Sequence, residues 1–101
     1  MKLLIVTVVH EFEKEILRLF KEAKIDSFSS SGIDGYKNHT EVLRAASWFP
    51  SEKEGVESSL FFSFVEEDKM DALFILITEF NTNLKTSNPI KAAVVPIESA
   101  I

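Results

Sequence analysis

Apolar residues along this chain follow two periods, and each change of period marks a new structural element. Residues 3–9 are apolar or β-branched at nearly every position, which is typical of a strand covered on both faces. The next apolar residues recur at helical spacing, with acidic residues in the first turn and lysines in the last, as the helix dipole favours. They predict a helix whose buried stripe is Phe12, Ile16, Leu19, Phe20 and Ala23.

Two further strands are predicted on either side of a long connection. Residues 26–36 are rich in Ser and Gly and predict a weak edge strand, whereas residues 57–66 are apolar on both sides and predict a central one. The connection over 37–56 is longer than an ordinary hairpin loop, and loops of this length are typically functional or disordered. It carries Trp48 and Phe49 before a charged tip. We therefore expect a mobile loop whose two aromatic residues either pack beneath it or bind a partner.

A second helix and a last strand complete the pattern. The helix is predicted over 69–81 with Asp68 as its N-cap, and a polar loop over 82–89 follows it. The strand is predicted over 90–97. It contains Pro96, which cannot donate a ladder hydrogen bond and therefore indicates a sheet edge or a strand end.

The order of these elements predicts one α+β domain over residues 1–101, of the ferredoxin-like βαββαβ type. Two helices are expected on one face of a four-stranded antiparallel sheet, with strands one and three central and the long loop between strands two and three. The first, third and fourth strands are nevertheless apolar on both faces, and an exposed apolar sheet face is an aggregation hazard. We therefore expect a homo-oligomer in which another subunit covers the second face, the alternative being a monomer with an open apolar face.

Composition narrows the classes of function. The chain has 11 Lys and Arg residues against 16 Asp and Glu residues, and its formal net charge of -5 disfavours nucleic acid as a partner. The absence of cysteine excludes disulfides and thiolate chemistry and suits a cytoplasmic location. The apolar N-terminal run is short and indicates a strand, not a signal peptide, and no apolar stretch approaches the roughly 20 residues that cross a bilayer.

Residues suited to catalysis are scarce. His10 and His39 are the only histidines, and no nucleophile–base spacing, paired carboxylates or phosphate-binding loop is evident, so we expect no enzymatic turnover. We expect His10 to be a cap or surface residue, and no cofactor to be required for folding. His39 and Glu41 are candidate ligands for zinc or copper(II), although such a site needs three or four ligands, which other subunits would have to supply.

The chain resembles the PII-like branch of the nitrogen regulatory proteins over nearly its whole length. The pair Gly35-Tyr36 and the stretch His39-Thr40-Glu41-Val42-Leu43-Arg44-Ala45-Ala46 are similar to the family's Gly-Phe pair and His-Thr-Glu-x-x-Arg-Gly stretch at the base of its T-loop. The end, Val94-Val95-Pro96-Ile97-Glu98-Ser99-Ala100-Ile101, is similar to the family's last strand, Leu-Pro-Val-Glu followed by small and apolar residues. The long loop occupies the place of the T-loop.

The resemblance implies a signalling protein that forms a homotrimer with inward-facing sheets. It also implies a ligand site in the clefts between subunits, and action on a partner such as a membrane transporter. The candidate ligand site consists of Gly35, Tyr36, Lys37 and Asn38 at the base of the loop, with Lys85 and Lys91 opposite them. Its lysines would bind a small anion or a nucleotide. The related CutA-like branch, which is linked to divalent-metal tolerance, provides the alternative of metal binding at His39 and Glu41.

The chain departs from the family's pattern just before the last strand. Standard PII proteins have a segment similar to Thr-Gly-x-x-Gly-Asp-Gly-Lys, where this chain has Asn83-Leu84-Lys85-Thr86-Ser87-Asn88-Pro89. Without glycines a tight nest of backbone amides is hard to form, and Pro89 lacks an N–H. The sequence also ends before the family's terminal arginines. The resemblance therefore does not imply that this chain binds ATP and 2-oxoglutarate as standard PII proteins do.

Overall fold

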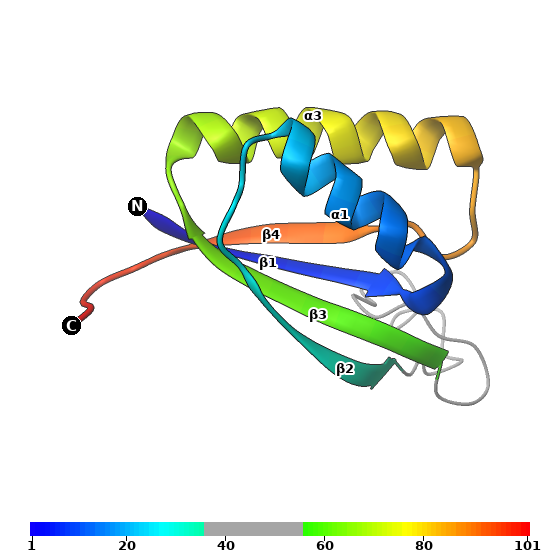
Figure 1. Ribbon diagram of the computed structural model, residues 1–101, viewed down its shortest axis with the longest axis horizontal. Helices are drawn as coiled ribbons and strands as arrows, with labels where there is room; N and C mark the ends of the chain where they lie inside the picture. The colour runs from blue at the N-terminus through cyan, green and yellow to red at the C-terminus, as the bar shows by residue number, and fades with distance from the viewer. Residues whose placement is uncertain (36–55) are drawn as a thin grey trace, which may run out of the picture.

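The sheet and its two helices appear in a computed structural model that describes residues 1–35 and 56–101 (Figure 1). The elements in chain order are β1 (Lys2–Val9), a 3-10 turn η1 (His10–Phe12), α1 (Glu13–Glu22), β2 (Ser29–Gly35), β3 (Val56–Val65), α3 (Glu67–Leu84) and β4 (Lys91–Pro96). The strands pair antiparallel in the order β2-β3-β1-β4. The predicted α+β, ferredoxin-like fold is therefore confirmed, with the first and third strands central.

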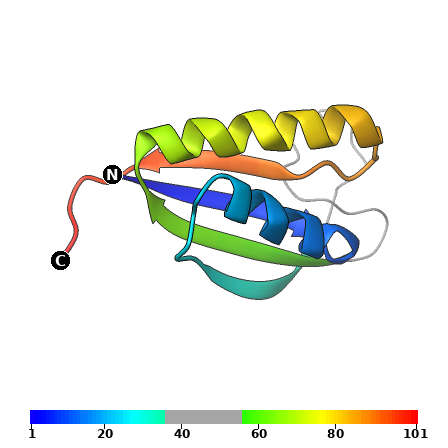
Figure 2. The ribbon, with the colours of Figure 1, turned by 45° about the horizontal axis from the view of Figure 1, so that its top comes forward.

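Both helices cover the same face of the sheet, as Figure 2 shows. β1 turns every second side chain toward them, and Leu4, Val6 and Val8 are fully buried there. Phe61 of β3 is buried beside them, opposite Val6 in the strand register. The helices complete this core. α1 contributes Ile16, Leu19 and Phe20, which the helical spacing predicts to be buried, and α3 contributes Met70, Leu73 and Ile77.

The opposite face of the sheet is also apolar. The register places Leu3 beside Phe64 and Val95, and Ile5 beside Phe62 and Ala93. Phe62 is 41% exposed, Phe64 57% and Val95 42%. We call this surface the open face, defined by Leu3, Ile5, Leu60, Phe62, Phe64, Ala93 and Val95. The predicted apolarity of both faces is confirmed, whereas the subunit expected to cover the open face remains a prediction.

The second helix is longer than its apolar spacing predicts. It begins at Glu67 with Glu66 as the N-cap, so the assignment of Asp68 as N-cap is wrong. Glu66 has an extended backbone, while Asp68 lies within the first turn, where a carboxylate suits the helix dipole. At the other end the helix runs through polar residues to Leu84, because exposed polar side chains do not interrupt backbone hydrogen bonding. No helix in the described part of the chain is both long and apolar enough to cross a membrane.

The end of α1 carries a left-handed residue that is not glycine. Lys24 has φ 62°, its N–H donates to the Lys21 carbonyl (3.1 Å), and the Ile25 N–H donates to the Phe20 carbonyl (2.9 Å). This is the hydrogen-bond pattern of a Schellman cap, which favours glycine at the left-handed position. We expect Lys24→Gly to raise the free energy of unfolding by about 0.5–1 kcal/mol, measured by urea denaturation, because it removes the strained Cβ.

Lys21→Gly is the matched control for this substitution. Lys21 lies within α1, where glycine is expected to lower the free energy of unfolding by about 1 kcal/mol. The same chemical change should therefore have opposite signs at positions three residues apart. A loss of stability in both variants would contradict the role assigned to Lys24.

Candidate functional site

A polar pair interrupts the apolar side of β1 that faces away from the helices. Thr7 follows Leu3 and Ile5 on that side, and the register places Lys91 of β4 and Leu60 of β3 beside it. Thr7 is fully buried, yet its hydroxyl has no hydrogen-bond partner among the described residues. Lys91 is half-buried. A buried hydroxyl without a partner costs free energy, so a group that completed its hydrogen bonding would stabilise this position.

The connection between α3 and β4, which precedes Lys91 in the chain, carries further polar groups. Lys85 is exposed and has a left-handed backbone with φ 52°. The Asn88 N–H donates to the Thr86 hydroxyl (3.0 Å), while the Asn88 side-chain oxygen is buried without a partner in the described part of the chain. The connection therefore offers the ammonium group of Lys85 and a free acceptor on Asn88, shortly before the Lys91 that pairs with Thr7.

The predicted ligand residues divide between opposite edges of the sheet. Gly35 is buried at the end of β2, whereas Lys91 begins β4, and two central strands separate these edges. Strands lie about 4.8 Å apart, so three steps place the two edges on the order of 14 Å from each other. Gly35 and Lys91 of one subunit therefore do not form one small site, and a ligand that contacts both residues has to lie between two subunits.

Several predicted residues lie outside the described part of the chain. These are Tyr36, Lys37 and Asn38 of the ligand site, the aromatic pair Trp48 and Phe49, the metal candidates His39 and Glu41, and the long loop that carries them. Within residues 1–35 and 56–101, no group of three or more His, Asp or Glu side chains is placed to hold a metal ion.

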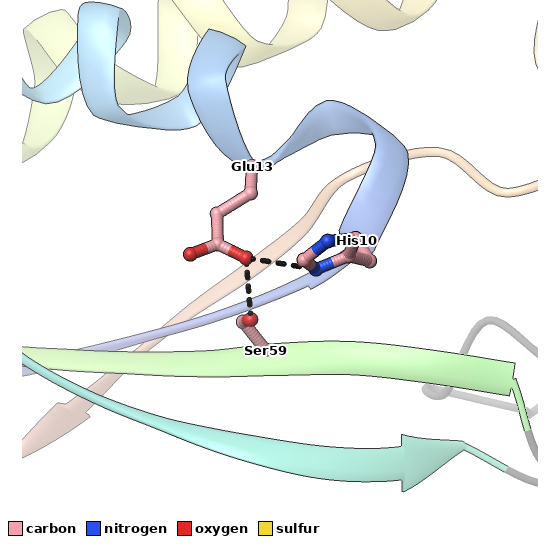
Figure 3. Close-up of polar contacts among 3 residues, drawn as sticks. All are labelled: His10, Glu13 and Ser59. Carbon is pink, nitrogen blue, oxygen red and sulfur yellow. Dashed lines mark hydrogen bonds and ion pairs between the residues drawn. The ribbon is translucent and has the colours of Figure 1, made fainter.

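His10 contacts a carboxylate that also ties the first helix to the sheet (Figure 3). Its Nδ1 lies 3.2 Å from Glu13 Oε2, and the hydroxyl of Ser59 donates to the same oxygen (3.1 Å). The serine proton is thus directed at a carboxylate, not at the imidazole, so the three residues do not have the order of a nucleophile and its histidine base. His10 is largely exposed at the start of η1, which agrees with the surface position expected from the sequence. The contact joins α1 to β3.

The carboxylates around this contact disfavour an anion among the described residues. A hollow of about 380 Å³ between His10 and the ends of β2 and β3 contains the carboxylates of Glu13, Asp34 and Glu57. Asp34 and Glu57 stand directly opposite each other on paired strands, an arrangement of like charges that would repel a phosphate or carboxylate. Cations suited to an anionic ligand are carried instead by Lys91, which begins β4, and by Lys85, which follows α3.

Thr7 is a candidate that the sequence pattern did not reveal. It is the one hydroxyl-bearing residue within the apolar run 3–9, and this was the signal available. Because threonine is β-branched and common in strands, its presence alone does not distinguish a binding residue from a strand former. The burial of its hydroxyl without a hydrogen-bond partner in residues 1–35 and 56–101 does distinguish it.

Comparisons with known proteins identify the fold. No protein-family model and no curated protein matches this sequence. Among solved structures, the chain is similar to CPII, a nitrogen regulatory PII-like protein from Thiomonas intermedia K12 that was solved bound to ADP, AMP and bicarbonate. The TM-score is 0.63 at 13% sequence identity, over 99% of this chain and 94% of that chain. The chain therefore shares its fold with a PII-like protein, as the resemblance in sequence implies.

Proposed function

We propose that this chain is a PII-like regulatory protein that senses a small anionic ligand or nucleotide at clefts between its subunits. The observation that carries the proposal is the position of Lys91 directly opposite Thr7 in the strand register, beside an otherwise apolar sheet face. The Thr7 hydroxyl is buried without a hydrogen-bond partner among the described residues. An ammonium group and a hydroxyl together suit a phosphate or carboxylate oxygen. CPII, which shares the fold, was solved with ADP, AMP and bicarbonate, so these are the first compounds to test.

The proposed assembly is a homotrimer. Its support is the open face, where Phe62 and Phe64 are exposed on a central strand. A second copy of the chain covers this face in the proposed assembly and brings Gly35 of one subunit toward Lys91 of another. The ligand site is complete only in that assembly, because the two residues lie on opposite edges within one subunit.

The proposed output is contact with a partner protein such as a membrane transporter. The residues proposed for this contact are Trp48 and Phe49, since aromatic side chains commonly dominate protein interfaces. In this proposal the protein acts by binding and not by catalysis. A ligand can change partner binding only if it interacts differently with two states of the protein.

Binding of ADP, AMP and bicarbonate, measured by calorimetry, tests the ligand site. We expect Lys91→Ala to weaken binding about 10- to 100-fold, because a hydrogen bond to a charged group contributes about 1.5–3 kcal/mol. We expect Thr7→Val to weaken it by up to about tenfold while the free energy of unfolding stays equal or rises, since the substitution removes an unpaired buried hydroxyl. Lys21→Ala is the control, with the same change of charge on an exposed helical lysine.

Unchanged affinity in both Lys91→Ala and Thr7→Val would reject this site. Zinc and copper(II) belong in the same series of titrations. Metal binding that His39→Ala abolishes, together with no binding of the three anions, would favour the CutA-like alternative over the nucleotide site.

A further inference from the structure

Asn81, near the end of α3, makes a reciprocal pair of hydrogen bonds with the backbone of Ile90. Its side-chain nitrogen donates to the Ile90 carbonyl (2.9 Å), and its side-chain oxygen accepts from the Ile90 N–H (2.9 Å). The Asn81 backbone carbonyl also accepts from the N–H of Lys85 (3.1 Å). One residue therefore binds both ends of the connection between the helix and the last strand.

This arrangement uses a side-chain amide in place of a neighbouring peptide group. The reciprocal pair resembles one step of a β-ladder, and it satisfies both backbone groups of a residue that is only 2% exposed. Without the amide, the N–H and carbonyl of Ile90 would have to find other partners within the core. Asn81 therefore defines where the backbone reaches the sheet after the left-handed residue Lys85.

The position of Ile90 in turn determines the position of Lys91. Lys91 is the next residue, begins β4 and stands opposite Thr7. The preceding connection contains no glycine, and Pro89 has no N–H to contribute. Backbone amides of a glycine-rich turn are thus not available to shape this segment, and the Asn81 side chain supplies the constraint.

We infer that Asn81 is a positioning residue of the proposed ligand site: its side-chain amide fixes the start of β4 and so holds Lys91 opposite Thr7. This inference rests on the proposed function. Asn81 acts through Ile90 and the backbone, without touching the ligand itself. Loss of the amide lets the start of β4 move, and the ammonium group of Lys91 then no longer has one position relative to the Thr7 hydroxyl.

The test compares Asn81→Leu with wild-type protein by two measurements on the full chain. Hydrogen exchange at the Ile90 amide should become faster, on the order of tenfold or more, because the acceptor is removed. The affinity for ADP should fall by a similar factor while the far-ultraviolet circular dichroism is unchanged. Asn81→Asp keeps an acceptor for the Ile90 N–H but places a carboxylate oxygen where the amide donated to the Ile90 carbonyl. It should therefore retain part of the exchange protection at Ile90 and lose less affinity for ADP than Asn81→Leu.

Ser63→Ala is the matched control for a merely structural effect. The Ser63 hydroxyl donates to the Ser27 carbonyl, so this variant also loses a part-buried hydrogen bond from a side chain to the backbone, on a different part of the sheet. We expect it to lower stability without changing the affinity for ADP. If Asn81→Leu does not fold, the Asn81→Asp variant provides the comparison.

The outcomes separate this inference from the proposed function. If Lys91→Ala weakens ADP binding and a folded Asn81→Leu does not, the positioning role is wrong and the ligand site stands. An equal loss of affinity in Ser63→Ala and Asn81→Leu would also overturn it, because the effect would then follow stability alone. If wild-type protein binds none of ADP, AMP and bicarbonate, the proposed function fails and the ligand role of Asn81 fails with it.

Discussion

Val6→Asp is expected to leave the purified protein unfolded. Val6 is fully buried beneath the helices, between Phe61 and Ala92 on the neighbouring strands. The buried cluster around it consists of apolar side chains, with no cation among its described members to pair with a carboxylate. An unpaired buried charge costs several kcal/mol, and the whole free energy of unfolding of a small domain is only about 5–15 kcal/mol. Circular dichroism should show no cooperative thermal transition.

Val95→Asp is the control, because it makes the same substitution on the other side of the sheet. Val95 is 42% exposed on the open face, where water can solvate the new carboxylate in the separated subunit. We expect this variant to keep the secondary structure of the wild type. A native spectrum and a cooperative transition in Val6→Asp would show that the face assigned to the core is wrong.

Phe62→Glu is expected to convert the proposed homotrimer to a folded monomer. Phe62 is 41% exposed in the centre of the open face, opposite Ile5 of β1. If another subunit covers this face, burial of each such side chain contributes about 1.5–3 kcal/mol, and the substitution also places a carboxylate in an apolar interface in every subunit. Light scattering at micromolar concentration should give a mass near 11.4 kDa for the variant and three times that mass for the wild type.

The control for Phe62→Glu is Ile75→Glu. Ile75 is 61% exposed on α3, on the helical side of the sheet, and its substitution should leave the assembly intact. Circular dichroism of Phe62→Glu distinguishes dissociation from unfolding, and Phe64→Ser is a milder second variant on the same face. A wild-type monomer would reject the proposed trimer, and a trimer that Phe62→Glu does not disturb would show that the interface lies elsewhere.

The pattern of apolar residues was sufficient to predict the elements, their order and the two central strands. The apolar residues from Phe12 to Ala23 recur at the spacing of one face of an α-helix. A Ser- and Gly-rich segment is poorly suited to the middle of a sheet. Pro96 indicated a strand end, and β4 does end there. These predictions succeed because they depend on local spacing and on the hydrogen bonds that each residue type can make.

Element boundaries were less predictable. Asp68 is a good N-cap by residue type, yet the helix begins at Glu67. The carboxylates of Glu66, Glu67 and Asp68 can each be accommodated near a helix start. Which of these residues is the N-cap therefore depends on the position and direction of the backbone where β3 ends. Residue preference contributes only a fraction of the free energy that fixes such a boundary.

Which face of the sheet the helices cover was decided only by the tertiary structure. β1 and β3 are apolar on both sides, so alternation shows that Val6 and Ile5 point in opposite directions without showing which one enters the core. The residues of the candidate ligand site were likewise not predictable from alternation along the chain. The unpartnered Thr7 hydroxyl and the reciprocal bonds of Asn81 with Ile90 depend on where distant backbone groups come to lie, and residue spacing along the chain contains no information about that position.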